Sequence, residues 1–279
     1  MSVARAGIVL CGGRSSRMGR AKAWLPWFDG RTLIEHVVER IRPAVDEVLV
    51  VTSVALDLPA LDARVVRDRE PERGPLAGLR DGLAATSAAH AFVTATDAPF
   101  LTTEYVDGML SRRAACAPVE EGHVQVLSAV YPGEGAAVAE RLLEEGRGRP
   151  RDLLEALDYE ALDANDPALA SAPWKGFNTP DAYLDAVRGE DPDARCRIEF
   201  LGRAALASKS PNLEVPVGTL GDVLAQAARA CDLDLDLVEG EQVARGHLVS
   251  LGGRDLVRDL SLPVGPDERI SVLDAQAGG

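Results

Sequence analysis

Short apolar segments alternate with amphipathic stretches through the first two-thirds of this 279-residue sequence. Four of the apolar segments are predicted to be buried strands, at Ala6–Cys11, Glu47–Thr52, Arg64–Asp68 and Ala91–Thr96. After the first strand, Thr32–Glu35 has the pattern of a capping box, and the apolar residues up to Pro43 share one helical face. Strands that alternate with helices in this way predict an α/β fold with a mostly parallel sheet.

The same pattern continues further along the chain. A strand is predicted at Val124–Val130, and helices are predicted at Ala136–Glu145, at Arg151–Leu157 and after a cap at Thr179. Polar residues follow three of the earlier strands, at Ser53, Asp68 and Asp97. Because ligands in open α/β sheets bind beyond the carboxyl ends of the strands, we expect these side chains to converge at one edge of the sheet.

The loop after the first strand, Leu10–Lys22, combines glycine with positive charge. Gly12, Gly13 and Gly19 permit positive φ values and allow a ligand to approach the backbone closely. The run also carries four cations suited to a triphosphate, at Arg14, Arg17, Arg20 and Lys22. Its spacing matches neither the Walker P-loop nor the Gly-x-Gly-x-x-Gly dinucleotide motif. We therefore expect a phosphate-binding loop of another class, with a simple tight turn as the alternative.

This loop resembles the signature of the molybdenum cofactor guanylyltransferases (MobA-type), Leu-x-Gly-Gly-x-Ser-x-Arg-Met-Gly-x-x-Lys, with Cys11 where alanine is more common. The resemblance implies a Rossmann-like nucleotidyltransferase domain. It also implies transfer of GMP from GTP to the phosphate of molybdenum-molybdopterin, with release of pyrophosphate. We therefore expect GTP as a substrate and Mg²⁺ as a cofactor.

The resemblance indicates which residues bind the substrates. The predicted nucleotide-binding residues are Leu10, Gly12, Gly13, Lys22, Ser53, Asp68, Gly78 and Asp97. Gly78 ends a Gly-Pro-Leu-Ala-Gly segment, and Ser53 stands where relatives tend to carry asparagine. Substrate contacts are expected from Arg149, in a basic turn suited to the pterin phosphate, and from Asn178, two residues after a glycine that replaces the first asparagine of the family's motif. A plain helix entry or a solvated turn is the structural alternative for these later segments.

The chemistry needs few protein groups. The nucleophile is a phosphate oxygen with a second pKa of about 6, so it is largely ionised at neutral pH and needs no general base. We expect Lys22, Arg17 and Asp97 to be the catalytic residues, with Asp97 as the Mg²⁺ ligand because hard oxygen ligands suit this ion. Asp97 is not needed as a helix cap, since Thr102 or Thr103 can cap the following helix.

The last third of the chain has a different pattern. A polar linker, residues 190–194, is predicted to separate a domain at 1–189 from one at 195–279. Strands at Arg195–Leu201 and Leu213–Val217, a helix capped by Thr219, and strands at His247–Leu251, Arg254–Leu256 and Arg269–Leu273 follow in the order of a small α+β, β-grasp (ubiquitin-like) domain.

The terminal Gly278-Gly279 pair resembles the tails of ubiquitin-like sulfur carriers, and Leu262–Leu273 resembles the small subunit of molybdopterin synthase (MoaD-type). The resemblance implies that Gly279 is adenylated and then converted to a thiocarboxylate. The implied partners are a ubiquitin-activating-like adenylating enzyme and the large subunit of molybdopterin synthase. A carrier of thiamine synthesis, or a tail that merely ends in small residues, is the alternative.

Composition excludes several other classes. A net charge of −14 opposes nucleic-acid binding, and no apolar run is long enough to span a membrane. The amino-terminal residues lack a signal-peptide core, which predicts a cytoplasmic location. The four cysteines, at Cys11, Cys116, Cys196 and Cys231, are too scattered for a zinc site or a disulfide framework, so we expect reduced packing residues.

Two alternatives to guanylyl transfer stay open at this stage. The opening motif is shared with cytidylyl- and uridylyltransferases that act on other pterins or on sugar phosphates. The first domain could also be an inactive scaffold, with only the carrier tail functional, although the presence of Lys22 and Asp97 favours an enzyme.

Overall fold

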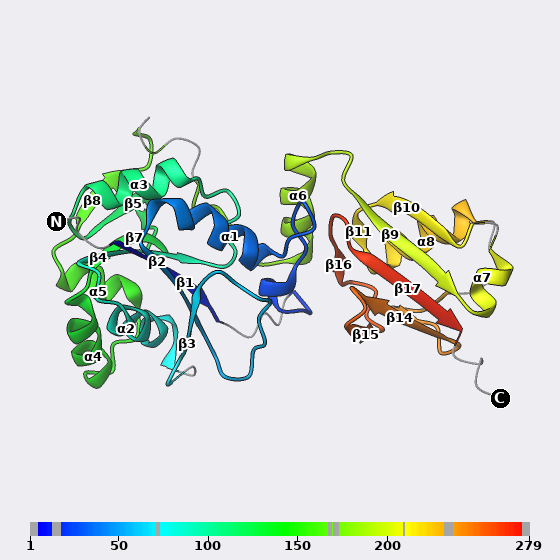
Figure 1. Ribbon diagram of the computed structural model, residues 1–279, viewed down its shortest axis with the longest axis horizontal. Coiled ribbons are helices and arrows are strands. Elements are labelled where there is room, and N and C mark those ends of the chain that lie inside the picture. Colours follow the sequence, from blue (N-terminus) through cyan, green and yellow to red (C-terminus); the bar gives the residue numbers. More distant parts are fainter. Residues whose placement is uncertain are drawn as a thin grey trace. The chain divides into compact units, whose positions relative to one another are not determined.

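The computed structural model describes residues 5–12, 18–70, 73–166, 169, 173–208, 210–231 and 237–274 (Figure 1). The chain forms two compact units. The first unit comprises Met1–Arg14 and Leu33–Gly176, and the second comprises Ser15–Thr32 and Phe177–Gly279. The chain therefore passes three times from one unit to the other, and the signature loop is divided between them.

The first unit is built on an eight-stranded sheet in the order β3-β2-β1-β4-β7-β5-β6, with β8 paired to β5. Its strands are β1 (Arg5–Cys11), β2 (Glu47–Thr52), β3 (Arg64–Arg67), β4 (His90–Ala95), β5 (Cys116–Glu120), β6 (His123–Val124), β7 (Ser128–Pro132) and β8 (Glu160–Asp163). The pairs that join β3, β2, β1 and β4 are parallel, whereas β7 runs antiparallel to β4. The predicted α/β fold with a largely parallel sheet is thus confirmed for this part of the chain.

Helices cover both faces of this sheet (Figure 1). They are α1 (Leu33–Ile41), the 3-10 turn η2 (Arg42–Ala44), α2 (Pro75–Ala85), α3 (Thr103–Ser111), α4 (Gly135–Glu144) and α5 (Pro150–Ala156). In Figure 1, α1 and α3 lie on one face, and α2, α4 and α5 lie on the other. Helix α2 packs so closely on the sheet that a Cβ at Gly82 would lie 2.8 Å from Ile8 and 3.0 Å from Val51. The predicted cap is confirmed at Thr102, whose side chain accepts the Tyr105 backbone N–H at 3.2 Å.

One predicted strand of this unit is wrong. The run Val124–Val130 does not form a single strand, because the chain turns after β6 before it enters β7. The Ser128 backbone N–H donates to the Gln125 carbonyl at 3.0 Å, and the Tyr131 hydroxyl donates to the Val126 carbonyl at 2.8 Å. The turn contains neither Gly nor Pro, and it is held by hydrogen bonds between residues three and five positions apart, which the hydrophobic pattern does not reveal.

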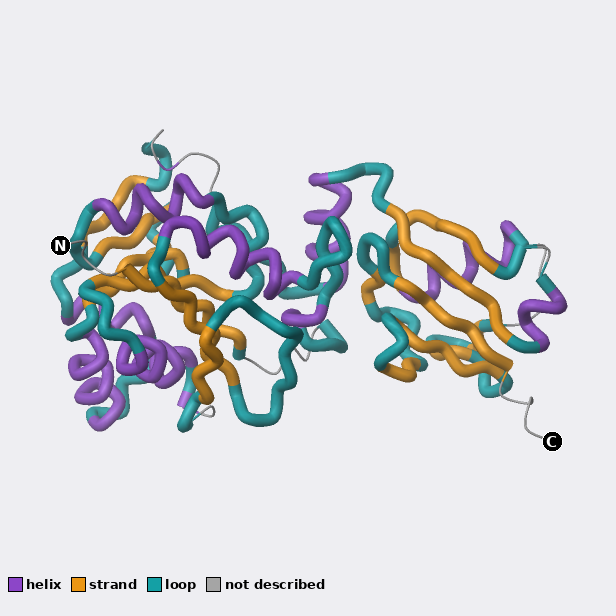
Figure 2. Tube along the Cα trace, in the orientation of Figure 1, coloured by secondary structure: helices purple, strands orange, loops and turns teal. Residues whose placement is uncertain are grey.

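The second unit contains a five-stranded sheet in the order β10-β9-β17-β14-β15. Its strands are β9 (Arg195–Leu201), β10 (Asn212–Pro216), β14 (His247–Leu251), β15 (Asp255–Val257) and β17 (Arg269–Asp274). Figure 2 shows these strands side by side. The central pair, β17 and β9, is parallel, and the other neighbours are antiparallel. Burial alternates along β9, where Cys196, Ile198 and Phe200 are buried, so the sheet has one apolar face.

Helix α8 (Leu220–Ala230) packs on that apolar face through Leu220, Val223 and Leu224. Its amino end is a complete capping box, in which the Thr219 side chain accepts the Asp222 backbone N–H and the Asp222 carboxylate accepts the Thr219 backbone N–H. The remaining elements of this unit are η1 (Lys22–Trp24), α6 (Pro180–Glu190), α7 (Arg203–Ala207), β11 (Gly218–Thr219), β12 (Val238–Glu239), β13 (Gln242–Val243) and β16 (Pro263–Val264).

The predicted linker, residues 190–194, contains the last residue of α6 and a turn. Its backbone is closed by a hydrogen bond from the Ala194 N–H to the Asp191 carbonyl at 3.1 Å. The division into domains 1–189 and 195–279 stays a prediction. All four cysteines are buried and free, and no helix in the described residues is long and apolar enough to cross a membrane.

Candidate nucleotide-binding site

The carboxyl ends of β1, β2, β3 and β4 meet at one edge of the first unit's sheet, because these four strands run parallel. Gly12, Ser53, Asp68 and Asp97 follow the four strands at this edge. The strand ends are tied together by backbone hydrogen bonds, from the Asp68 N–H to the Thr52 carbonyl at 2.8 Å and from the Thr96 N–H to the Leu10 carbonyl at 3.3 Å. The structure therefore brings these predicted residues to a common edge.

Gly78, in the first turns of α2, lies against two other predicted nucleotide-binding residues. A Cβ at this position would be 3.5 Å from Asp68 Oδ2 and 3.9 Å from Leu10 Cδ2. Among the described residues, apart from its chain neighbours, no atom comes within 4 Å of a Cβ built on Gly12. Leu10, Asp68 and Gly78 thus form one wall at the sheet edge, and the described residues do not fill the space next to Gly12.

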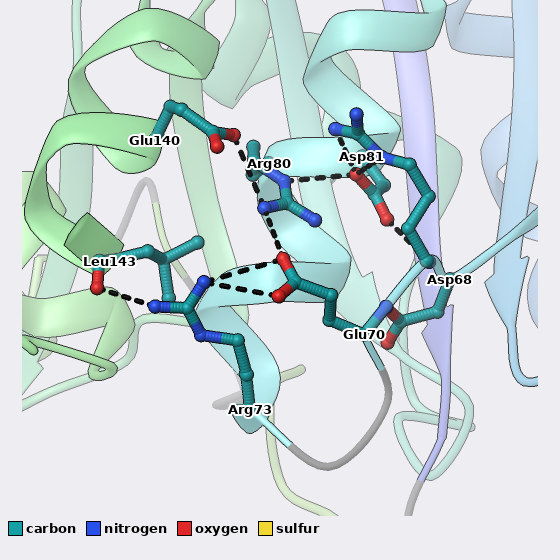
Figure 3. Close-up of polar contacts among 8 residues, drawn as sticks. Asp68, Glu70, Arg73, Arg80, Asp81, Glu140 and Leu143 are labelled. Carbon is teal, nitrogen blue, oxygen red and sulfur yellow. Dashed lines mark hydrogen bonds and ion pairs between the residues drawn. The ribbon is translucent and has the colours of Figure 1, made fainter.

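A network of charged side chains holds the segment that carries Asp68 (Figure 3). Arg80, a buried residue of α2, forms ion pairs with Glu70 at 2.8 Å, with Asp81 at 2.9 Å and with Glu140 at 3.2 Å. Asp81 also accepts the backbone N–H of Arg69 at 2.8 Å. The segment after β3 is therefore anchored to α2 on its charged side.

This network was missed by the sequence analysis. Its one local signal is the Arg80-Asp81 pair inside an otherwise apolar helix, Pro75–Ala85. Burial of that pair requires partners, which are Arg69 and Glu70 after β3 and Glu140 of α4. The sequence does not indicate which of the many exposed charges these partners are.

The electrostatic environment of Asp68 differs from that of Asp81. Burial raises the pKa of the Asp68 carboxyl above its usual range, although the Glu70 backbone N–H donates to it at 2.8 Å. Burial also disfavours the charged form of Asp81, but hydrogen bonds from Arg69 and Arg80 outweigh it and hold the pKa of Asp81 below its usual range. Asp81 is thus satisfied within the protein, whereas Asp68 gains from a further hydrogen-bond donor.

Asp97 lies in the turn after β4 and is half-buried. Gly176 packs directly on it, since a Cβ added there would run into the Asp97 carbonyl oxygen and approach its carboxyl carbon to 3.3 Å. Gly176 is the residue that replaces the first asparagine of the family's motif. The close approach to Asp97 explains why a side chain is not accommodated at this position.

Two cations of the predicted phosphate-binding loop, Arg20 and Lys22, are among the described residues and belong to the second unit. Lys22 Nζ donates to Asn178 Oδ1 at 2.7 Å, so the structure joins a predicted catalytic residue to a predicted substrate-binding residue. Arg20 was expected to supply charge to a triphosphate, but its guanidinium is instead paired with Glu268 at 2.8 Å.

Arg149 is exposed at the amino end of α5. The adjacent Gly148 lies beside the loop that leads into α2, because its Cβ would be 3.3 Å from the Arg73 carbonyl oxygen. The predicted residues Gly13, Arg17 and Gly279 lie outside the described residues.

Asp97 is the residue expected to bind Mg²⁺. Within the described parts of the chain, no group of three or more His, Cys, Asp or Glu side chains could hold a metal ion. Mg²⁺ often takes only one or two protein carboxylates and completes its shell with water and substrate phosphates. A single carboxylate at Asp97 fits that mode of binding.

Comparisons with known proteins agree with this geometry. A family model for the MobA-like NTP transferase domain matches residues 7–162, which is more than half of the chain. A probable molybdenum cofactor guanylyltransferase of Mycobacterium avium (strain 104) is 35% identical over 169 residues, or 58% of this chain and 86% of that protein. A probable molybdenum cofactor guanylyltransferase of Mycobacterium tuberculosis (strain H37Rv) is 38% identical over 166 residues, or 56% of this chain and 82% of that protein.

The fold of the first unit also has a counterpart among solved structures. The molybdopterin-guanine dinucleotide biosynthesis protein A of Archaeoglobus fulgidus aligns with a TM-score of 0.53 at 21% identity, over 65% of this chain and 96% of that one. This likeness shows the fold alone, and the matches to the family model and to the mycobacterial proteins show the family. The chain belongs to the MobA-like NTP transferase family and is a nucleotidyltransferase.

Proposed function

We propose that this protein transfers GMP from GTP to the phosphate of molybdenum-molybdopterin and releases pyrophosphate. The observation that carries the proposal is the edge of the parallel sheet, where Leu10, Asp68 and Gly78 form a wall and the described residues leave space beside Gly12. Identities of 35% and 38% to proteins named as probable molybdenum cofactor guanylyltransferases favour guanine over other bases.

In this proposal the protein binds and orients two anions. The acceptor phosphate is largely ionised at neutral pH, with a second pKa of about 6, so the reaction needs no general base. Lys22 contacts the GTP phosphates and stabilises the charge that develops on them, and Arg17, five residues earlier in the chain, assists it. Asn178 accepts a hydrogen bond from Lys22 and orients its ammonium group.

Three further residues have assigned roles. Asp68 accepts a hydrogen bond from a donor on the nucleotide, and Arg149 binds the phosphate of the pterin. Asp97 would hold Mg²⁺, which supplies charge neutralisation for the phosphates when bound.

The test is pyrophosphate release from GTP, CTP, UTP and ATP, each supplied separately with Mg²⁺ and molybdenum-loaded pterin. We expect GTP to be preferred and Lys22→Ala to lower turnover by roughly a hundredfold, as loss of a transition-state donor does. A preference for CTP or UTP would move the protein to another branch of the nucleotidyltransferases. Full activity of Lys22→Ala would refute the site assignment.

A second function, as a sulfur carrier, is favoured by the last 85 residues. The sheet order β10-β9-β17-β14-β15, with a parallel central pair and one covering helix, is the arrangement expected of a β-grasp domain. Three exposed leucines also lie in register across neighbouring strands, because Leu273 of β17 pairs with Leu201 of β9 and with Leu248 of β14. Such an apolar row just before the chain end suits a protein partner that receives the tail.

We propose that Gly279 is adenylated by a ubiquitin-activating-like enzyme and, as a thiocarboxylate, donates sulfur within molybdopterin synthase. Addition of one residue after Gly279 is expected to abolish thiocarboxylate formation, measured by mass spectrometry, because the new terminus cannot be adenylated at Gly279. Pyrophosphate release from GTP should be unchanged in the same variant. Thiocarboxylate formation at the usual rate with the added residue would refute the role of Gly279.

A further inference from the structure

The signature segment, defined here as residues 18–27, is held within the second unit by a shielded ion pair. Arg20 Nη1 lies 2.8 Å from Glu268 Oε1 and 3.0 Å from Glu268 Oε2, and it also donates to the Pro263 carbonyl at 3.2 Å. The two side chains are only 13% and 3% exposed. Glu268 Oε2 accepts a further hydrogen bond from the Gly265 backbone N–H at 3.1 Å. The carboxylate thus connects the segment to the loop before β17, 248 residues further along the chain.

Apolar and aromatic contacts reinforce this pair. Gly19 has a φ of +67°, and a Cβ added there would collide with Leu262. The Trp24 ring lies 3.0 Å from the Arg254 guanidinium carbon, in a cation–π contact. The Tyr183 hydroxyl of α6 donates to the Pro26 carbonyl. Contacts of several kinds therefore fix the segment against residues from the last hundred of the chain.

Burial of the Arg20–Glu268 ion pair has a large unfavourable desolvation free energy. A carboxylate as deeply buried as Glu268 is stable only with a partner, and removal of one member of a buried pair leaves an uncompensated charge. Arg20 satisfies Glu268 in a defined geometry, and Lys22 follows only two residues later. Lys22 in turn donates to Asn178 at 2.7 Å, so the backbone around residues 20–22 is held at both of these side chains.

We infer that Glu268 is a positioning residue for nucleotidyl transfer: it holds Arg20 and thereby fixes the segment that presents Lys22. This inference rests on the proposed function, in which Lys22 contacts the GTP phosphates. The C-terminal part of the chain, which contains Glu268, then contributes to nucleotidyl transfer, and this contribution does not depend on Gly279. The family signature leaves position 20 open, so this role belongs to the particular pair of residues in this chain.

The test uses the full-length protein and the variants Glu268→Gln, Arg20→Gln and the double variant. The matched control is Glu199→Gln, because Glu199 forms an ion pair with Arg269 at 2.6 Å in the sheet of the same unit. We expect Glu268→Gln and Arg20→Gln each to lower kcat/KM for GTP roughly tenfold or more, with most of the loss in kcat, since a small misplacement of a catalytic group is expensive. The double variant should be no worse than either single variant, because the pair acts as a unit. The control should retain the wild-type value.

Hydrogen–deuterium exchange measures the positioning without reference to activity. In Glu268→Gln we expect faster exchange in residues 18–27 and unchanged exchange in β1, β2 and β4. Arg20→Lys keeps the positive charge, so we expect it to lose less kcat/KM and less protection from exchange than Arg20→Gln. If Glu268→Gln does not fold, the comparison of Arg20→Lys with Arg20→Gln takes its place.

The two proposals fail in different ways. If the wild type does not transfer GMP, the proposed function fails, and the exchange measurement still decides whether Glu268 holds the segment. If the wild type transfers GMP and Glu268→Gln shows the same kcat/KM and the same exchange in residues 18–27, the positioning role is overturned. A lower unfolding temperature with unchanged kcat would also overturn it, because the pair would then be structural only.

Discussion

The environment of Asp68 destabilises its ionised side chain in the folded protein and leaves it able to accept a hydrogen bond from a ligand. Burial raises the pKa of its carboxyl group, so the folded state binds a proton more tightly than the unfolded state does. The ionised side chain therefore costs folding free energy at pH 7, and this cost disappears as the pH falls below the unfolded pKa of about 4. We expect a hydrogen bond from the bound nucleotide to offset this loss of folding free energy.

We therefore predict that Asp68→Asn raises the thermal unfolding temperature at pH 7 and lowers kcat/KM for GTP. The stabilisation should shrink when unfolding is measured below pH 4, where the wild-type carboxyl is protonated in both states. Thermal unfolding at the two pH values, together with GTP turnover at pH 7, checks the prediction. A lower unfolding temperature of Asp68→Asn at pH 7 would show that the charge stabilises the fold.

Gly176 shows how one absent side chain shapes the site. A Cβ at this position would run into the Asp97 carbonyl, so Gly176→Ala must displace the turn that carries Asp97. We expect a loss of about 1–3 kcal/mol in the free energy of unfolding and a clear drop in transfer activity. Gly189→Ala is the control, because Gly189 lies in α6 and no described residue outside the helix backbone comes within 4 Å of its Cβ. This variant should be neutral or slightly stabilising. Denaturant unfolding of both variants decides this, and equal stability would contradict the close approach.

At the scale of an element, α2 contains two buried charged residues, Arg80 and Asp81, and several of their ion-pair partners lie outside the helix. Asp81 is 3% exposed and binds both Arg69 and Arg80, so Asp81→Asn leaves the buried Arg80 with fewer charged partners. We expect this variant to lose about 3 kcal/mol of unfolding free energy at pH 7. Because hydrogen bonds from the two arginines depress the pKa of Asp81, its stabilising effect is present above the unfolded pKa and is lost as the pH falls through the folded pKa.

The measurement is denaturant unfolding of Asp81→Asn and wild type at pH 7 and in acid. Glu140→Gln serves as the comparison within the same network, because Glu140 is 48% exposed and its pair with Arg80 is screened by solvent. A small loss in Asp81→Asn, equal to that of Glu140→Gln, would mean that the network does not anchor the loop after β3.

The elements themselves were largely predictable from hydrophobic periodicity. The strands at β1, β2 and β4 and the caps at Thr102 and Thr219 are set by residues close in sequence, and the structure contains them. The strand predicted at residues 124–130 was wrong because the chain turns there without Gly or Pro, and the Tyr131 hydroxyl holds the turn through a hydrogen bond to the Val126 carbonyl. Strands β5 and β8 were not predicted, and each is short, at five and four residues. Their sequences, CAPVE and EALD, contain a proline or acidic ends that are unfavourable in strands, whereas the equally short β3 and β14 are rich in Val and Leu.

At the scale of the whole molecule, the sequence predicted the sheet edge but not the grouping of the chain. Gly12, Ser53, Asp68 and Asp97 could be placed because each follows a predicted parallel strand. The assignment of residues 15–32 to the second unit could not be foreseen, since it depends on contacts such as Arg20 with Glu268 across 248 positions. Pairings of this kind leave no periodic trace in the sequence.

The central claim is that the α-phosphate of GTP becomes attached to the molybdenum-bound pterin. The most direct measurement supplies GTP labelled at the α- or the γ-phosphate, together with Mg²⁺ and molybdenum-molybdopterin, and separates the products. The account predicts that the α-label appears in a guanine dinucleotide form of the cofactor and that the γ-label appears only in pyrophosphate. Label from the α-phosphate that never reaches the pterin, or that reaches it equally well from CTP, would contradict guanylyl transfer by this protein.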